Sequence, residues 1–290
     1  MKTFLAVTLL LGLLLASCSS DGDASSKGTT STIVNKGSDT IVNLALAWAE
    51  AYKGVEPRVD IAVTGGGSGT GIAALINGTV DVANASRQIK PVERDEAVAN
   101  DVEPVEFVIA RDAIAIIVHP TNPITELSID QLSDIYSGKI SNWSELGGDD
   151  RPIVKLSRET NSGTHVYFLE QVLRKGDKED STLFSPDTLL LPSSEGIMSE
   201  VRDNPNALGY DGLGYVTDDV KVVAVAGEQS CFYVLPSIET VNNAKYPISR
   251  DLYMYTAGEP TGRILAYLEW ILQADAQTIV SDLGFVPATP

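Results

Sequence analysis

The sequence predicts an α/β protein with two lobes and a ligand cleft between them. Short β-prone segments alternate with helical segments, which is the order that places helices against a largely parallel sheet. A proline-containing break at 120–123 separates a first set of elements from a second. The predicted lobes are 33–118 with 250–290 for lobe 1, and 119–249 for lobe 2.

The first lobe begins with a short strand that leads through a loop into an amphipathic helix. Apolar residues such as Ile41, Leu44 and Trp48 recur there at the spacing of one helix face. The same order of strand, loop and helix then repeats. The predicted strands are 33–34, 59–63, 80–83, 107–109 and 113–118, and the predicted helices are 41–52, one that begins at Ile72, and 93–100.

The second lobe contains a helix with a clear start signal. Ser128 is a helix cap, and Gly138 follows the helix that it begins. We expect the chain to cross between lobes near Val118 and Arg250, which returns the last helix to lobe 1. The further predicted strands are 153–156, 207–216 with a turn, 220–225 and 252–255, and the helices are 128–136, 166–174, 194–202 and 262–274.

The first residues predict export from the cytoplasm. Lys2 precedes an apolar run at 4–15 that is too short to span a bilayer comfortably, and small residues follow it. This order is typical of a signal peptide, here 1–17. Cys18 at the cleavage point resembles the lipid-bearing cysteine of bacterial lipoproteins, and an ordinary signal peptide cut nearby is the alternative. Residues 18–32 are polar and predict a flexible tether.

Composition narrows the class of partner. The chain has 39 acidic and 21 basic side chains and a net charge of −18, which argues against nucleic acid or anionic lipid. Cys231 is the one cysteine after Cys18, and its apolar surroundings predict a buried thiol. Trp48, Trp143 and Trp270 are expected to pack in the core or at partly exposed positions and not to stack on a ligand. No metal or cofactor is expected, and we expect a monomer.

Three polar loops each come directly before a predicted helix. They are rich in glycine and hydroxyl side chains. A helix N-terminus offers unpaired N–H groups and a partial positive charge, so such a loop can hold an oxyanion. The loops are Gly37-Ser38-Asp39-Thr40, 65–71 with Ser68, and Arg158-Glu159-Thr160-Asn161-Ser162-Gly163-Thr164.

Each loop taken alone could be an ordinary helix cap. Arg158 strengthens the anion interpretation, because its planar fork suits two oxygens of one anion, although a surface arginine is the alternative. The glycine loop lacks the Lys-Ser/Thr ending of a P-loop and the register of a dinucleotide site.

At these loops the chain resembles the phosphate-binding proteins of bacterial phosphate-specific ABC transporters, within the type II periplasmic binding proteins. Besides the three loops, the matching stretches include Asn84-Ala85-Ser86-Arg87, the run 135–143, Gly209-Tyr210, and Tyr246-Pro247-Ile248-Ser249-Arg250. The resemblance implies two lobes that close on dehydrated phosphate and an ABC permease as partner. It also implies phosphate contacts from Ser38, Asp39, Thr40, Ser68, Arg87, Arg158, Ser162, Gly163 and Thr164.

One position departs from part of the family. Some members have an aspartate after the Ala-Ser pair, where it accepts a hydrogen bond from protonated phosphate, and here Arg87 stands in that place. An acceptor in the site separates phosphate from sulfate, which carries no proton near pH 7. Our hypothesis is that Asp39 or a backbone carbonyl takes this role.

Other functions remain as alternatives. The site could bind sulfate, molybdate or tungstate, or the protein could be a phosphate sensor or a phosphohydrolase. His119 and His165 show no metal-ligand spacing, and structural or surface roles are favoured for both. No Gly-x-Ser-x-Gly elbow occurs. We therefore predict a binding protein without turnover.

Overall fold

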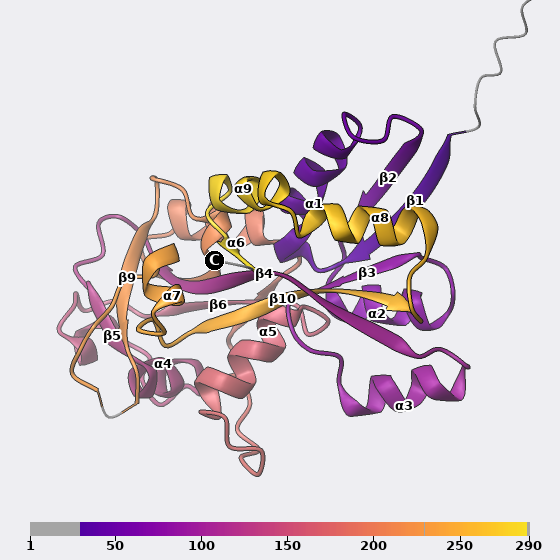
Figure 1. Ribbon diagram of the computed structural model, residues 1–290. Coiled ribbons are helices and arrows are strands. Elements are labelled where there is room, and N and C mark those ends of the chain that lie inside the picture. Colours follow the sequence, from indigo (N-terminus) through magenta and orange to yellow (C-terminus); the bar gives the residue numbers. More distant parts are fainter. Residues whose placement is uncertain (1–29, 229, 289–290) are drawn as a thin grey trace, which may run out of the picture.

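The computed structural model describes residues 30–228 and 230–288, which form one α/β molecule (Figure 1). The described strands are β1 (Ser31–Gly37), β2 (Val59–Thr64), β3 (Val82–Ala85), β4 (Pro104–Val118), β5 (Glu126–Ser128), β6 (Val154–Arg158), β7 (Leu189–Leu191), β8 (Ala207–Gly212), β9 (Lys221–Ala226), β10 (Ser249–Ala257) and β11 (Val286–Pro287). The described α-helices are α1 (Asp39–Tyr52), α2 (Ser68–Ile76), α3 (Pro91–Ala99), α4 (Ile129–Tyr136), α5 (Gly163–Phe168), α6 (Ser194–Asp203), α7 (Ile238–Asn242), α8 (Gly262–Ile271) and α9 (Ala274–Asp282).

The sheet is mixed and continuous, in the order β2-β1-β3-β10-β4-β8-β6-β7. Its two ends are parallel, but β10 and β4 in the middle run antiparallel to their neighbours. The prediction of a largely parallel sheet is therefore wrong at the centre. The middle strands are the ones that carry the chain between the lobes, so helical crossovers do not set their direction.

β4 joins the two halves of the molecule. Residues 104–113 pair with β10, whereas residues 114–118 pair with β8. The two strands predicted at 107–109 and 113–118 are thus one strand of 15 residues. Figure 1 shows β4 and β10 running through the middle, with β1, β2 and β3 on one side and β5, β6 and β9 on the other.

The first helix confirms the periodicity read from the sequence. Ile41, Leu44, Ala45, Trp48 and Tyr52 are all buried on one face of α1. The start of α4 is confirmed as well: the Ser128 hydroxyl accepts a hydrogen bond from the backbone N–H of Gln131, which completes a capping box.

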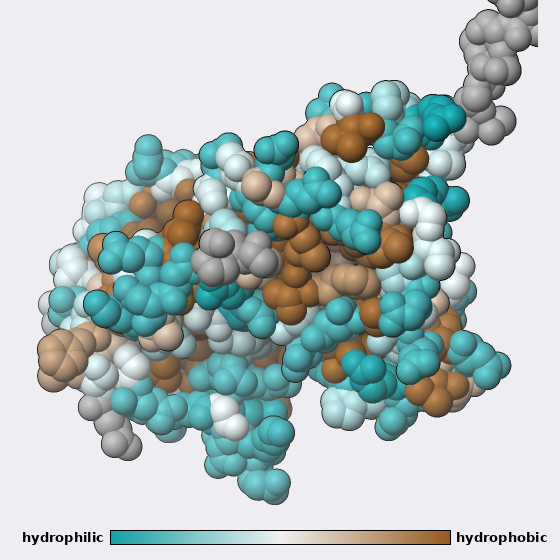
Figure 2. Space-filling model, viewed as in Figure 1, coloured by the Kyte–Doolittle hydropathy of each residue, from teal (hydrophilic) through white to brown (hydrophobic). Residues whose placement is uncertain are grey.

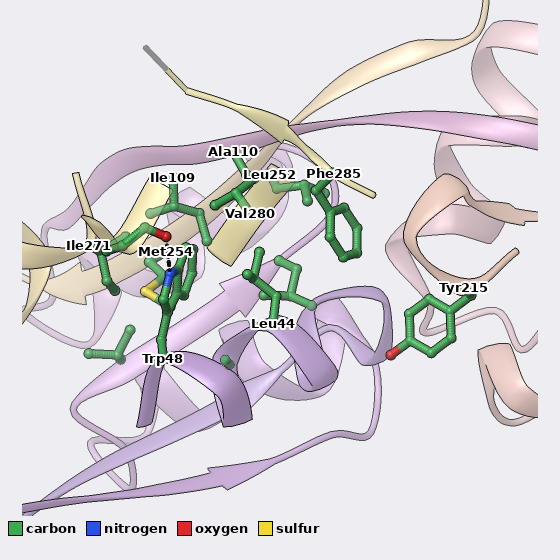
Figure 3. Close-up of a cluster of buried hydrophobic side chains, with 14 of the residues drawn as sticks. Leu44, Trp48, Ile109, Ala110, Tyr215, Leu252, Met254, Ile271, Val280 and Phe285 are labelled. Carbon is green, nitrogen blue, oxygen red and sulfur yellow. Dashed lines mark hydrogen bonds between the residues drawn. The ribbon is translucent and has the colours of Figure 1, made fainter. Parts of the chain in front are cut away.

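The end of the chain packs on its beginning. Trp48 of α1 donates a 2.9 Å hydrogen bond from Nε1 to the carbonyl of Ala276 in α9. Figure 3 shows Trp48 and Leu44 packed with Ile109 of β4 and Met254 of β10. In this core the last helix packs against α1 near the beginning of the described chain. All three tryptophans are buried, as predicted.

Three local expectations differ from the structure. β1 begins at Ser31 and so includes the last two residues of the predicted tether, because its backbone pairs with β2 from Ser31 onward. The helix α2 begins at Ser68, inside the glycine loop. Cys231 is exposed, and the prediction of a buried thiol is wrong, since residues 230–232 form no strand and the Phe232 N–H donates to the Ser230 hydroxyl.

Within the described ranges, none of the helices combines the length and the hydrophobicity that a membrane span requires. The predicted signal peptide, the lipid-bearing Cys18 and most of the tether lie outside those ranges.

Candidate functional site

The three polar loops meet where the two lobes face each other. Ser38 precedes α1, Ser68 begins α2, and Ser162 precedes α5. Gly69 donates a 3.0 Å backbone hydrogen bond to the carbonyl of Asn161, which joins the second loop to the third. The structure therefore brings together the loops that the sequence singled out, in a conformation with the lobes in contact.

Hydroxyl groups from both lobes lie close together at this point. Oγ1 of Thr40 lies 2.8 Å from Oγ1 of Thr164. Oγ of Ser68 accepts a 3.0 Å hydrogen bond from the backbone N–H of Ser86, and their hydroxyls lie 3.2 Å apart. The Ser38 hydroxyl is buried without a hydrogen-bond partner among the described residues. We call these residues with Ser162 and Gly163 the cradle.

Gly163 permits the closest approach within the cradle. A Cβ atom at this position would lie 2.4 Å from Oγ of Ser68 and 2.5 Å from Oγ of Ser86. No side chain fits in that space, so glycine is required for α5 to meet α2. The third loop is capped locally, since the Ser162 hydroxyl accepts from the Thr164 N–H at 3.2 Å.

Arg158 is fully buried, and its three guanidinium nitrogens donate five hydrogen bonds. The acceptors come from both lobes, and two of them are carboxylates. They are the Leu191 carbonyl, the Ser194 hydroxyl, Asp211, Asp39 and the Pro192 carbonyl, at 2.7–3.4 Å. Through these contacts Arg158 joins segments of both lobes, and we call this arrangement the Arg158 junction. A contact between Arg158 and a ligand remains a prediction.

Asp39 is the lobe 1 partner of this junction. Its Oδ2 accepts from Nη2 of Arg158 at 3.1 Å and from the backbone N–H of Ser194 at 2.8 Å. The Tyr215 hydroxyl donates to its carbonyl at 2.7 Å. All three donors belong to lobe 2, so Asp39 links the lobes.

Arg87 lies beside the cradle and forms an ion pair. Its two terminal nitrogens donate to both carboxylate oxygens of Glu93, at 2.8 and 2.6 Å. The Arg87 side chain is 7% exposed, and its Nε has no hydrogen-bond partner among the described residues.

A second buried arginine, Arg250, also reaches the cradle. Its Nη2 donates to Oγ1 of Thr164 at 3.0 Å and to Asp112 at 2.9 Å, and its Nη1 donates to the Ser86 carbonyl at 3.0 Å. Sequence reasoning missed Arg250, Asp112 and Ser86 as site residues. The stretches 84–87 and 246–250 carried the signal for Ser86 and Arg250, because both match the family.

Burial perturbs two groups next to the cradle. Burial raises the pKa of Asp112 to about 6, although the Arg250 guanidinium opposes this shift. Burial lowers the pKa of His165 to about 4, so its ring is neutral near pH 7. Among the described residues, no three His, Cys, Asp or Glu side chains form a group that could hold a metal.

Two α/β lobes that share a central pair of strands, with hydrogen-bond donors facing each other across the junction, define a two-lobed solute-binding protein of type II fold. A family model described as the PBP superfamily domain matches residues 23–275. The chain belongs to this superfamily and, within it, to the family of bacterial phosphate-binding proteins named PstS.

Two curated relatives illustrate this membership. The chain is 33% identical over 277 residues to the phosphate-binding protein PstS of Pseudomonas aeruginosa. This match covers 90% of this chain and 84% of that relative. It is 31% identical over 301 residues to PstS of Bacillus subtilis. This match covers 99% of this chain and 95% of that relative.

Solved structures agree on the fold. A candidate phosphate ABC transporter substrate-binding protein of Clostridium perfringens, solved with bound phosphate, matches with a TM-score of 0.80 and 34% identity, over 89% of this chain and all of that chain. An ABC-type phosphate transport receptor of Vibrio cholerae matches with a TM-score of 0.69 and 27% identity, over 89% of this chain and all of that one.

Proposed function

We propose that this protein captures inorganic phosphate outside the cytoplasm and delivers it to an ABC permease. The observation that carries the proposal is the convergence of three hydroxyl-bearing helix starts from two lobes. Backbone N–H groups and hydroxyls at helix N-termini are suited to an oxyanion that has lost its water. Because the donors come from both lobes, an anion that contacts them all favours the closed form.

The proposed ligand contacts are those of the cradle. Ser38, Ser68 and Thr164 supply donors from the three loops. Arg250 supplies positive charge at Thr164, and Arg158 supports the loops through its carboxylate partners. The relatives named above support phosphate as the anion, since their names and the Clostridium perfringens structure refer to phosphate.

Calorimetric titration of the protein with phosphate, sulfate, molybdate and tungstate tests the proposal. We expect tight phosphate binding and weak or absent binding of the other anions. Ser68→Ala removes one hydroxyl and leaves the Ser86 N–H without its acceptor, which should weaken phosphate binding by about ten- to hundredfold. Ser281→Ala, on α9 outside the site, is the matched control. Tight sulfate binding without phosphate binding would overturn the choice of ligand.

An enzymatic function predicts a different result. A phosphohydrolase would release the coloured product from a chromogenic phosphate ester and would lose this activity in Arg158→Ala. The binding proposal expects no release from either protein.

We further propose that Cys18 carries the lipid that anchors the protein to the membrane. The supporting observation is the order of a short apolar run and small residues before that cysteine. Cys18→Ala should release the protein from the membrane fraction of expressing cells. The anchor would be contradicted if the variant still sediments with the membrane. It would also be contradicted if mass spectrometry of the wild-type protein finds a mature N-terminus other than lipid-modified Cys18.

A further inference from the structure

The glycine-rich loop of lobe 1, residues 65–71, holds one residue of lobe 2. Asn161 lies directly before Ser162, the cap of α5. Its side-chain Nδ2 donates a 2.9 Å hydrogen bond to the carbonyl of Gly66. Its own carbonyl accepts the 3.0 Å hydrogen bond from the backbone N–H of Gly69. Asn161 therefore bonds to the loop both as a donor and as an acceptor.

Gly67 leaves the space into which Asn161 fits. A Cβ atom at Gly67 would lie 2.8 Å from the carbonyl oxygen of Asn161 and 3.1 Å from its Cγ. The φ angle of Gly67 is 91°, a value that residues with a Cβ atom rarely adopt. In the sequence the glycines of this loop indicated room for an anion, and in the structure Gly67 makes room for Asn161 of the other lobe.

The start of α2 is divided between two tasks. Gly69 is the second residue of α2, and its N–H, one of the groups without a partner inside the helix, donates to Asn161. Ser68, the first residue, has its hydroxyl in the cradle, 3.2 Å from that of Ser86. The start of α2 thus serves the cradle through Ser68 and the contact between the lobes through Gly69.

The contact lies at the outer edge of the cradle. Asn161 is exposed, whereas Ser68 and Thr164 are fully buried. Figure 2 shows the surface notched between the part that carries α3 and the part that carries α5, so the lobes are not joined along the whole of their border. A bond at this edge can therefore hold the lobes together from outside the buried donors.

We propose that Asn161 is a positioning residue, which clasps the glycine loop of lobe 1 and slows the release of the anion from the cradle. The inference rests on the proposed function, because the clasp acts on the same ligand. A bound anion leaves only after the lobes separate, and separation breaks both hydrogen bonds of Asn161. Binding begins with separated lobes, in which these bonds are not made, so the clasp acts on dissociation and leaves association unchanged.

The test separates association from dissociation. Asn161→Ala removes the bond from Nδ2, while the carbonyl of Gly66 keeps its 2.7 Å hydrogen bond from Oγ1 of Thr70, so the loop retains a local partner. We expect phosphate to dissociate about fivefold faster than from the wild type, measured by a chase of bound radioactive phosphate with excess unlabelled phosphate. The Kd from calorimetry should rise by the same factor, which leaves the association rate at its wild-type value.

Two further variants complete the test. Asn161→Leu keeps the approximate volume of the side chain without its donor and should release phosphate as fast as Asn161→Ala. Asn100→Ala removes a similar bond, the 2.8 Å contact from Nδ2 to the carbonyl of Glu96, but this bond lies within lobe 1, so the wild-type rate should remain.

Three results would overturn the clasp: wild-type release from either Asn161 variant, equally fast release from Asn100→Ala, or slower association with unchanged dissociation. A wild-type protein that binds no phosphate would instead overturn the proposed function itself, whatever the variants do.

Discussion

Asp39 and Ser194 lie on different lobes, and the Asp39 carboxylate accepts a 2.8 Å hydrogen bond from the backbone N–H of Ser194. Ser194 is the first residue of α6, so the carboxylate lies at a helix N-terminus, where negative charge is stabilised. Arg158 donates to the same oxygen atom. The Asp39 carboxylate therefore links lobe 1 to the N-terminus of α6 and to Arg158 in lobe 2.

Asp39→Asn should weaken this link. The amide keeps the shape of the side chain but loses the charge that strengthens both hydrogen bonds, a loss of about 1–3 kcal/mol. We expect about tenfold weaker phosphate binding and a larger radius of gyration by small-angle X-ray scattering. Asp60→Asn makes the same charge change at an exposed position on β2 and should alter neither quantity.

The same variant tests whether Asp39 recognises the phosphate proton. If it does, Asp39→Asn should reduce the preference for phosphate over sulfate in calorimetric titrations across pH 5.5–8.5. Unchanged selectivity would assign Asp39 to lobe closure alone, and a backbone carbonyl would then be the proposed acceptor.

Gly163→Ala should separate two loops of the cradle. The new Cβ would lie 2.4 Å from Oγ of Ser68, so the helices α2 and α5 must move apart. Such overpacking costs about 1–3 kcal/mol, and we expect phosphate affinity to fall by at least tenfold. In Gly227→Ala the nearest atom to the new Cβ would be Cβ of Pro247 at 3.7 Å, so its affinity should remain normal. Equal affinities in calorimetry would show that α2 and α5 need not approach this closely.

Arg158→Lys distinguishes a structural junction from a simple ligand contact. An ammonium group cannot replace five directed hydrogen bonds, and the fully buried Asp211 would keep only the backbone N–H of Gly212 and lose its guanidinium partner. We expect the free energy of unfolding of the ligand-free protein to fall by about 3 kcal/mol, measured by chemical denaturation. Arg263→Lys, at an exposed and distant pair with Asp81, should change it little. Wild-type stability in Arg158→Lys would leave Arg158 free for the ligand.

The sequence predicted the elements that local pattern determines. The buried face of α1 follows directly from apolar residues at helical spacing, and the start of α4 follows from its capping residue Ser128. The central strands were less accessible, because pairing direction depends on residues far apart in the chain. β4 changes partner from β10 to β8 within one strand, and no local signal marks that change.

In the candidate site, too, the parts with a local sequence signal were predicted and the parts that depend on distant residues were not. The three loops were found because glycine and hydroxyl residues before a helix have a local meaning. The partners of Arg158 were not found, since Asp39 lies 119 residues away from it and Asp211 lies 53 residues away. Arg250 was overlooked as a donor for a similar reason: only the fold brings it to Thr164, 86 residues distant.

The buried ring of His165 should make the free energy of unfolding fall in acid. Burial lowers the pKa of His165 to about 4 in the folded protein, whereas an unfolded chain has a value of about 6.5. Between these values the unfolded state binds the extra proton, so the contribution of His165 to stability is lost as the pH falls from about 6.5 to 4. We expect His165 to account for about 1–3 kcal/mol of the fall in the free energy of unfolding over this range.

His165→Gln should therefore flatten the pH dependence of stability, measured by chemical denaturation at pH 7, 6, 5 and 4. Carboxylates contribute equally in the wild type and the variant, so the difference between their two curves isolates His165. Parallel curves for the two proteins would mean that His165 takes up a proton as easily in the folded protein as in the unfolded chain.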